Sequence, residues 1–416
     1  MVGGGSTYTP ELVEGFVKRA DRIQVDELVL LDIDAERLSV VGEMAQRMLD
    51  YLDWTGRLTL TGDRESAIDG ADFVLIQLRV GGQATRLIDE TLPPRFGVVG
   101  QETTGAGGFA KALRTVPVVL ELAELTNRRA APGAWIVDFT NPVGIVTQAL
   151  LDEGHRAIGL CNVAINIQRT IAKRLGVAAH RVDLEHVGLN HLSWERAAFV
   201  DGVDRLPELL ASDADWLADH VGMPVELIRA LGAIPSYYLH YYYETAQVVA
   251  DQRNGHTRAQ DVMDIEARLL DLYRDPALAE KPALLADRGG AFYSEAAAQL
   301  IASLHDGAGD LQVVDMRNDG ALPDLPDSAV VEIPARIDRD GAHALSLAPL
   351  APEMRGLVQA AKAYEELTVE AARTGDRRTA LRALIANPLV GEFAIAEPLL
   401  AALLDANRNH LPRFFA

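Results

Sequence analysis

Short apolar runs alternate with longer helical patterns through the first half of this chain, and this alternation most constrains its fold. Four such runs are expected to be strands, with a segment of helical pattern between each and the next: residues 27–32, 72–79, 134–142 and 157–162. Strands joined by crossover helices pair in parallel, so this half predicts an open α/β sheet. Ligands bind at the carboxyl ends of such strands, and Arg79, Asn141 and Cys161 lie at or just past these ends.

The second half has a different pattern. Residues 182–200 alternate enough to predict strands of a mixed or antiparallel sheet, and residues 313–334 predict a strand–loop–strand unit. Long helical stretches are expected around residues 225–250, 258–273 and 355–385. The pattern changes near residue 165 without a visible linker, which predicts two domains that share one large interface: residues 1–165 and residues 166–416.

Composition narrows the classes of partner. No apolar run approaches the roughly 20 residues that span a bilayer, and no signal-peptide pattern is visible, so neither a membrane nor export is expected. The net charge of −21 repels a phosphate backbone, which excludes nucleic acid and means that an anionic substrate needs a local group of arginines. The single cysteine, Cys161, suits a reducing cytoplasm. Acidic residues such as Asp261, Asp264 and Glu266 are expected on a solvated surface.

The opening stretch MVGGGSTYTP places three glycines after only two residues. A glycine turn, then a helix expected from Pro10 with Thr9 as its N-cap, then an acidic residue at the next strand's end, is the order of a dinucleotide-binding fold. The predicted cofactor-binding residues are Gly3, Gly4, Gly5, Ser6, Thr7 and Asp32. A flexible terminus is the alternative. Because almost no strand precedes the glycines, we expect that the first strand is truncated and that the natural start lies upstream.

Three further stretches carry groups suited to a ligand. In QLRVGGQATR, Arg79 follows a strand and Arg86 is expected on the next helix, where two guanidiniums suit a phosphate or a carboxylate; surface salt bridging is the alternative. GQETTGAGGF (100–109) predicts a long, unstructured functional loop. Asn141 in DFTNPVG suits a sugar hydroxyl or a nicotinamide, unless it is only a turn residue.

Cys161 in GLCN and His191 in GLNHLSW are candidates for a shared metal site, although each is also a common kind of buried core residue. Thiolate and imidazole on their own suggest zinc before a harder metal. The stretch IPSYYLHYYYE holds five tyrosines between Tyr237 and Tyr243. Tyrosines at helical spacing usually form a packing face, but a phenol also serves as a general base when a cation lowers its pKa.

Together these motifs resemble those of glycoside hydrolase family 4, the NAD- and divalent-metal-dependent glycosidases, over nearly the whole chain. Seven stretches match in the family's order: GGGSTYTPELV, LLDID, QLRVGGQATR, GQETTGAGGF, FTNPVG, GLCN and GLNHLSW. The resemblance implies a Rossmann-like NAD-binding domain and a C-terminal α+β domain like that of lactate and malate dehydrogenases. It also implies a redox route, in which hydride leaves carbon 3 of the sugar, a tyrosine removes the carbon 2 proton, the leaving group is eliminated, and water addition and reduction follow.

The resemblance also implies roles for particular residues. Cys161 and His191 occupy the family's metal-ligand positions, and the family's metal is generally manganese rather than zinc. The base is Tyr238 or Tyr241, and the sequence leaves both open. Asn141 should contact the sugar, and a 6-phosphate should meet Arg79, Arg86 and Arg258. Family members generally form homodimers or homotetramers.

Position 162 bears on the substrate. In the family, asparagine after the cysteine accompanies β-glycosides and aspartate accompanies α-glycosides, so Asn162 implies a 6-phospho-β-glucosidase for phosphorylated disaccharides or aryl glycosides. Ala164 departs from the family's usual proline, which loosens the loop beside the metal ligand. The alternatives are a family 4 glycosidase for a 6-phospho-galactoside or an unphosphorylated glycoside, a 2-hydroxyacid dehydrogenase, and a non-catalytic sensor of NAD or a sugar phosphate.

Overall fold

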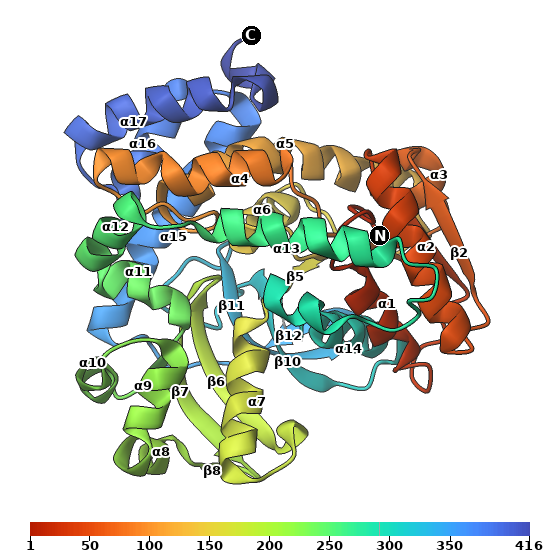
Figure 1. The fold of residues 1–416 in the computed structure, drawn as a ribbon. Coiled ribbons are helices and arrows are strands. Elements are labelled where there is room, and N and C mark those ends of the chain that lie inside the picture. The colour runs from red at the N-terminus through yellow and green to blue at the C-terminus, as the bar shows by residue number, and fades with distance from the viewer. Residues whose placement is uncertain (291) are drawn as a thin grey trace.

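A central sheet takes strands from both halves of the chain (Figure 1). The computed structural model describes residues 1–290 and 292–416. A parallel pair, β1 (Glu27–Leu31) and β2 (Arg57–Thr61), lies at one side, and six strands continue the sheet in the order β12 (Gly341–Ala344), β11 (Val330–Asp338), β10 (Asp310–Arg317), β5 (Ala157–Gly159), β4 (Trp135–Asp138) and β3 (Phe73–Ile76). The pairs β3–β4 and β4–β5 are parallel, as the sequence predicted, whereas β10, β11 and β12 are antiparallel.

Met1 and Val2 lie between β1 and β3 and connect the two pieces of the sheet. Val2 forms parallel bridges with Leu31 and Ile76. The Val2 N–H donates to the Leu75 carbonyl over 2.8 Å, and the Leu31 N–H donates to the Met1 carbonyl over 2.9 Å. The glycine turn that follows therefore leaves from the carboxyl edge of the sheet, which is the position of a dinucleotide loop.

Helices bury both faces of the sheet. Alternate residues of one strand lie in different cores, as Val74 and Leu75 do, which explains why these strands read as continuous apolar runs. One core includes residues of α1 (Thr9–Val17), α2 (Ala35–Tyr51), α13 (Arg258–Tyr273) and α14 (Tyr293–Asp306). The other includes residues of α3 (Arg64–Ile68), α5 (Gly105–Arg129), α6 (Val143–Asp152), α15 (Pro352–Thr374), α16 (Arg377–Ala386) and α17 (Phe393–Ala406).

A second, antiparallel sheet packs against β11 through its strand β6. It consists of β6 (Val182–Leu189), β7 (Leu192–Val200), β8 (Val203–Asp204) and β9 (Ile234–Pro235). The antiparallel strands predicted over residues 182–200 and the strand–loop–strand unit predicted over 313–334 are both confirmed. Helices α7 (Val163–Leu175), α8 (Leu206–Ser212), α9 (Ala214–Val221) and α10 (Val225–Leu231) flank this sheet (Figure 1).

The helices expected over 225–250 and 355–385 are each interrupted. Helix α10 ends at Gly232, and the tyrosine stretch then forms a 3₁₀ turn (Tyr237–Leu239) and the short α11 (His240–Tyr243) before α12 (Thr245–Asn254). Helices α15 and α16 are separated at Gly375, whose φ of 71° favours glycine. The first helix begins at Thr9, with Tyr8 as its N-cap, rather than at Pro10.

The prediction of an unstructured loop over residues 100–109 is wrong for its second half. Helix α5 starts at Gly105, and α4 (Gly82–Thr91), which carries Arg86 as predicted, packs beside it. Glycines are needed here because α5 approaches other backbone closely. A Cβ added at Gly108 would lie 2.0 Å from the Thr103 carbonyl oxygen, and one at Gly107 would lie 2.2 Å from that of Gln101. The glycines therefore allow close packing within a helix.

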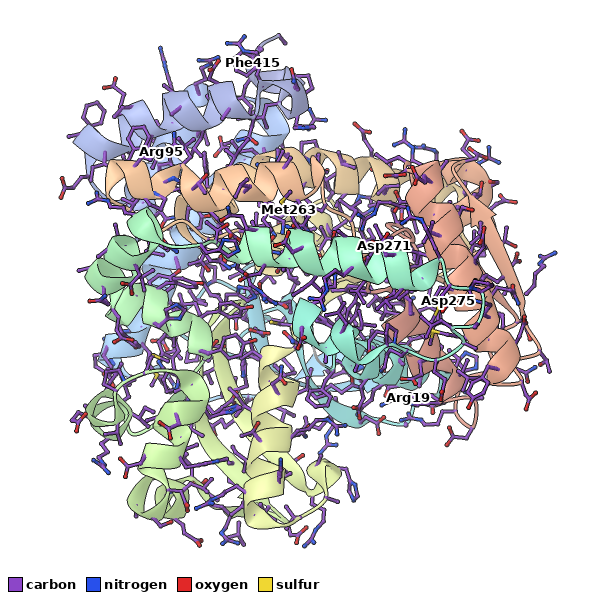
Figure 2. The ribbon with its side chains drawn as sticks, viewed as in Figure 1. Arg19, Arg95, Met263, Asp271, Asp275 and Phe415 are labelled. Carbon is purple, nitrogen blue, oxygen red and sulfur yellow. The ribbon has the colours of Figure 1, made fainter. Side chains whose placement is uncertain are left out.

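The acidic surface predicted for α13 is confirmed on its outer side only. Figure 2 shows Met263 and Asp271 on the outer side of the helix, and Asp264 is also exposed. Glu266 instead faces inward and is buried against Arg37 and Arg288. Within the described residues, no helix is both long and apolar enough to cross a membrane.

The close packing of α5 predicts an asymmetry between two glycine-to-alanine substitutions in helices. We expect Gly108→Ala to destabilise the fold by about 2 kcal/mol, because its methyl group would overlap the Thr103 carbonyl. Gly356→Ala on α15 meets no atom within 4 Å and should stabilise the fold by about 0.5–1 kcal/mol, since alanine favours helix. Thermal or urea unfolding of both variants checks this, and equal stability of the two would contradict the packing argument.

Candidate active site

Three predicted residues follow neighbouring strands and a fourth lies at a hairpin turn. Arg79, Asn141 and Cys161 come two or three residues after the ends of β3, β4 and β5, so the predicted positions at the carboxyl edge are confirmed. His191 occupies the turn between β6 and β7, with a φ of 63° that is rare for a residue with a side chain. The fold thus directs three loops of the first sheet and one hairpin toward a common region.

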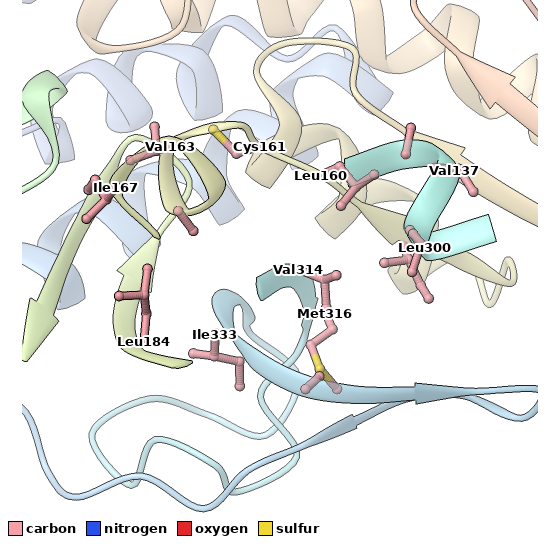
Figure 3. Close-up of a cluster of buried hydrophobic side chains, with 14 of the residues drawn as sticks. Val137, Leu160, Cys161, Val163, Ile167, Leu184, Leu300, Val314, Met316 and Ile333 are labelled. Carbon is pink, nitrogen blue, oxygen red and sulfur yellow. The ribbon is translucent and has the colours of Figure 1, made fainter. Parts of the chain in front are cut away.

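Tyr238 links Cys161 to His191. Its ring stacks on the His191 imidazole with centroids 3.6 Å apart and planes 12° from parallel. Burial raises the pKa of Tyr238 well above its ordinary value, and the neighbouring Tyr237 and Cys161 raise it further. The Cys161 thiol lies in the same buried cluster as Leu160 and Val163 (Figure 3) and interacts with the hydroxyl of Tyr293. The two predicted metal ligands therefore share one neighbour, as their common site requires.

Several buried polar atoms of this region have no hydrogen-bond partner among the residues that the structure describes. They are Nδ1 of His191, both amide atoms of Asn190, and Oδ1 of Asn141. Burial lowers the pKa of His191 to about 3, so its imidazole is neutral, which is the form that binds metals. Burial also raises the pKa of the Cys161 thiol well above its usual value, which keeps the thiol protonated unless a cation is bound beside it.

These donors fit a divalent cation held by few protein ligands. No group of three or more His, Cys, Asp and Glu side chains suited to a metal occurs in the described part of the chain. Cys161 and His191 would therefore supply two ligands, and the remaining positions would be open to oxygen ligands, as in a catalytic rather than a structural site.

A buried carboxylate, Glu102, gathers three cations beside this region. Arg79 pairs with both of its oxygens, the Arg86 Nη2 lies 3.4 Å from Oε1, and the Lys111 Nζ lies 2.6 Å from Oε2. Burial raises the pKa of Glu102, but the three cations lower it well below its ordinary value. Burial and Arg79 lower the pKa of Lys111 to about 7 despite its carboxylate partner. A second buried carboxylate, Glu90, pairs with the Arg86 Nε over 2.7 Å, so two carboxylates face two arginines and Lys111 in this cluster.

The structure brings Arg79 and Arg86 together and places Arg258 differently. Arg258 is exposed at the start of α13 and donates to the carbonyl of Asp287. Arg288, at the end of the 3₁₀ helix Ala283–Arg288, is partly buried within the electrostatic reach of Arg79 and Arg86, donates to the Thr7 hydroxyl over 2.9 Å and pairs with Glu266 over 3.0 Å. Arg288 is a cation that the sequence analysis did not identify.

The glycine loop and Asp32 meet as predicted. The Asp32 carboxylate accepts hydrogen bonds from the Gly5 N–H over 2.8 Å and from the Asp34 N–H over 3.0 Å. The N–H groups of Gly3 and Gly4 both donate to the Leu31 carbonyl. Ser6 Oγ accepts from the Tyr8 N–H, and the Thr7 carbonyl accepts from Tyr273. The carboxyl end of β1, the glycine loop and Asp32 are thus joined by hydrogen bonds in one unit.

The two candidate bases have different surroundings. Tyr238 is stacked on His191. The ring centroid of Tyr241 lies 6.5 Å from that of Tyr238, and Tyr241 faces the arginine–Glu102 cluster. Burial, Glu90 and Glu102 raise the pKa of Tyr241 to about 12, and the Arg86 cation limits the rise.

Asn162, beside Cys161, is the buried N-cap residue of α7. The region also includes Asn190, Glu102, Lys111 and Tyr293. These residues are identified only by their proximity in the folded chain, which the sequence does not reveal.

Comparison with known proteins identifies the family. Residues 1–177 match family 4 glycosyl hydrolase and residues 186–390 match the family 4 glycosyl hydrolase C-terminal domain. The chain belongs to this family. It is 41% identical to a probable 6-phospho-β-glucosidase of Bacillus subtilis, over 100% of this chain and 97% of that protein.

Solved structures agree. A 6-phospho-β-glucosidase of Thermotoga maritima, solved with manganese, NAD⁺ and glucose-6-phosphate, superposes with a TM-score of 0.91 at 35% identity and covers 98% of each chain. Malate dehydrogenase of Plasmodium falciparum matches with a TM-score of 0.52 at 16% identity, over 89% of this chain and 97% of its own. The latter likeness concerns the fold alone, and it confirms the dehydrogenase-like architecture predicted from the sequence.

The Glu102 cluster predicts a large stability effect for a small substitution. We expect Glu102→Gln to cost about 3–5 kcal/mol, because it leaves three cations without their shared carboxylate in a buried site. The matched control is Glu27→Gln, which breaks the exposed pair with Arg57 and should change stability by less than about 1 kcal/mol. Urea unfolding measures both, and a cost for Glu102→Gln as small as that of the control would refute the role of the carboxylate.

Proposed function

We propose that this chain is a 6-phospho-β-glucosidase that uses NAD and a divalent cation, and that this cation is manganese. The observation that carries the proposal is the pairing of a neutral His191 with the Cys161 thiol across Tyr238, beside a buried group of arginines at the carboxyl edge of a dinucleotide-type sheet. The 41% identity to a probable 6-phospho-β-glucosidase supports it.

The residues of the first sheet suit NAD. Asp32 would accept hydrogen bonds from the hydroxyls of the adenosine ribose, and residues 3–7 would lie against the pyrophosphate. Ile33, directly after Asp32, is 95% exposed and offers an apolar surface to the adenine. When bound, NAD would accept and return a hydride at carbon 3 of the sugar, and the divalent cation would polarise the oxygen there.

The chain's own residues would bind the sugar and move its protons. Cys161 and His191 hold the cation, and the amide of Asn141, whose Oδ1 is unpaired among the described residues, would bond to a sugar hydroxyl. A tyrosine would take the proton from carbon 2. We assign this role to Tyr241 because the Arg86 cation favours its phenolate, whereas Tyr238 is stacked on His191.

The 6-phosphate would lie against the excess of cations. Arg79 and Arg86 share Glu102, Arg86 also pairs with Glu90, and Arg288 shares Glu266 with Arg37, so four arginines face three carboxylates. A dianion in their reach would gain charge-assisted hydrogen bonds that an uncharged hydroxymethyl group does not make. Arg258, at the start of α13, donates to the Asp287 carbonyl beside Arg288, where it would support that segment or reach the phosphate from outside.

Asn162 favours β-glycosides over α-glycosides within this proposal because, in the family, asparagine after the cysteine accompanies β-glycosides; its amide cannot donate a proton to a leaving group as a carboxylic acid does. The second candidate within the family is a glycosidase for a 6-phospho-galactoside or an unphosphorylated glycoside. The candidate from another class is a sensor without turnover.

Because phosphorylated sugars do not cross membranes unaided, we propose a cytoplasmic location. A homodimer or homotetramer remains a prediction.

The proposal predicts a specific pattern of turnover with aryl 6-phospho-β-glucoside. Activity should require both NAD⁺ and Mn²⁺, and no NADH should accumulate, since the cofactor ends as it began. Removing the 6-phosphate should lower kcat/KM on the order of a hundredfold, the value of about two charge-assisted hydrogen bonds. The galacto epimer and the α-anomer serve as controls for specificity.

Four outcomes of these assays would contradict parts of this proposal. Activity that survives omission of NAD⁺ or Mn²⁺ would refute the redox route. Full activity without the phosphate would refute the role of the arginines. Stoichiometric NADH would point instead to a dehydrogenase, and NAD⁺ binding without turnover of any glycoside would point to a sensor.

The assignment of the base predicts unequal effects of two phenylalanine substitutions. Tyr241→Phe should lower kcat by about 10²–10⁴, the contribution of a general base, and should stop exchange of a carbon 2 deuterium into water. Tyr238→Phe should cost less, because phenylalanine preserves the stack on His191. Loss of exchange in Tyr238→Phe and not in Tyr241→Phe would reverse the assignment.

A further inference from the structure

A set of buried ionisable residues lies behind the proposed metal ligands and has no part in the function proposed above. It consists of His186 on β6, Glu195 on β7, Asp315 on β10 and Glu332 on β11, each at most 1% exposed. Burying charged groups costs free energy unless they are paired, so such a set calls for a reason.

Two of these residues belong to the hairpin that carries His191. His186 and Glu195 lie directly opposite each other on β6 and β7, and the His186 Nδ1 is 2.7 Å from the Glu195 Oε1. His191 occupies the turn of the same hairpin. A movement of the hairpin stem at His186 would therefore move His191.

The other two residues belong to the sheet that carries Cys161. Asp315 pairs with Glu332 across β10 and β11, and it also pairs with Gly159 on β5, two residues before Cys161. A Cβ added at Gly159 would lie 2.8 Å from the Asp315 Cβ, so the two backbones approach closely at this point. The position of Glu332 is therefore fixed relative to the loop that carries Cys161.

One contact joins the two groups. The His186 Nε2 lies 3.4 Å from the Glu332 Oε2, an ion pair that connects the hairpin with the sheet. Strands β6 and β11 pack side by side, and Leu184 and Ile333 on these strands lie in the same buried cluster as Cys161 (Figure 3).

The charge of His186 gives this contact an electrostatic component, although at 3.4 Å it is an ion pair without a hydrogen bond. Burial alone would lower its pKa, but the carboxylates of Glu195 and Glu332 raise the pKa to about 10, so the imidazole is charged at neutral pH. A buried imidazolium that loses one carboxylate is strongly destabilised, and the pair therefore tolerates little change in the distance between hairpin and sheet.

We propose that the His186–Glu332 ion pair, with Glu195 holding the imidazole, sets the distance between His191 and Cys161 and so determines the affinity for the divalent cation. His186 and Glu332 are positioning residues, because neither is proposed to touch the cation or the substrate. The inference rests on the metal site of the proposed function. Partners that orient metal ligands typically change metal affinity by 10- to 100-fold.

The test measures Mn²⁺ binding and NAD⁺ binding separately in the full chain. Free Mn²⁺ is followed by electron paramagnetic resonance during titration, and NAD⁺ affinity is measured calorimetrically. The variants are His186→Gln, Glu332→Gln and the double variant. The matched control is His343→Gln, which breaks an exposed His–Asp pair with Asp338 at 2.9 Å on the same sheet.

We expect each single variant to bind Mn²⁺ at least about tenfold more weakly, with NAD⁺ affinity within twofold of the parent. The double variant should bind no more weakly than the worse single variant, because both changes break one contact. The control should bind both ligands as the parent does. Glu195→Gln, which leaves the His186–Glu332 contact in place, should have an intermediate effect on Mn²⁺, and it replaces a single variant that does not fold.

Different results would overturn the inference and the metal site separately. Unchanged Mn²⁺ affinity in the folded variants, or an equal loss of NAD⁺ binding, would show that the ion pair only stabilises the fold. Additive effects in the double variant would show that the two residues act independently. A Cys161→Ala variant that binds Mn²⁺ as the parent does would refute the metal site and with it the positioning role.

Discussion

The pairing of β10 with β5 is the contact on which the arrangement of the site depends. It is antiparallel, it joins the two halves of the chain in one sheet, and its register places Asp315 opposite Gly159. This pairing helps to hold the strand-end loops of the first half against the hairpin with His191, together with the packing of β11 and α7 on β6. A ligand pair drawn from both parts needs such a junction, because a metal site tolerates only small changes in the distance between its donors.

The electrostatics of the site divide it into two regions. Burial keeps His191, Cys161 and the tyrosines uncharged, because each would have to lose its hydration to ionise. Arg79, Arg86 and Glu102 beside them remain charged, because they are paired, whereas burial lowers the pKa of Lys111 to about 7. In a chain with a net charge of −21, this local excess of cations gives an anionic ligand one favourable place to bind.

Strand positions were predictable from the sequence because buried parallel strands read as continuous apolar runs, and Arg79, Asn141 and Cys161 follow them directly. Two kinds of feature were not. The glycines of 105–108 read as a loop, although they serve the close approach of helix α5 to other backbone. Glu266 read as surface, since the helix alone does not reveal that Arg37 and Arg288 lie against its inner face. Both depend on contacts distant in the sequence.

The hairpin shows why the functional residues of such a site extend beyond its ligands. His191 has a left-handed backbone conformation and no hydrogen bond from its Nδ1 to any described residue, so nothing at the turn itself fixes its distance from Cys161. The stacked Tyr238 restrains the plane of the imidazole but leaves sliding along that plane possible. The stem, where His186 meets Glu332, is the place to which we assign the restraint on this distance. A buried charged pair is a poor source of stability, so the positioning role that we propose gives a reason for its presence between the two sheets.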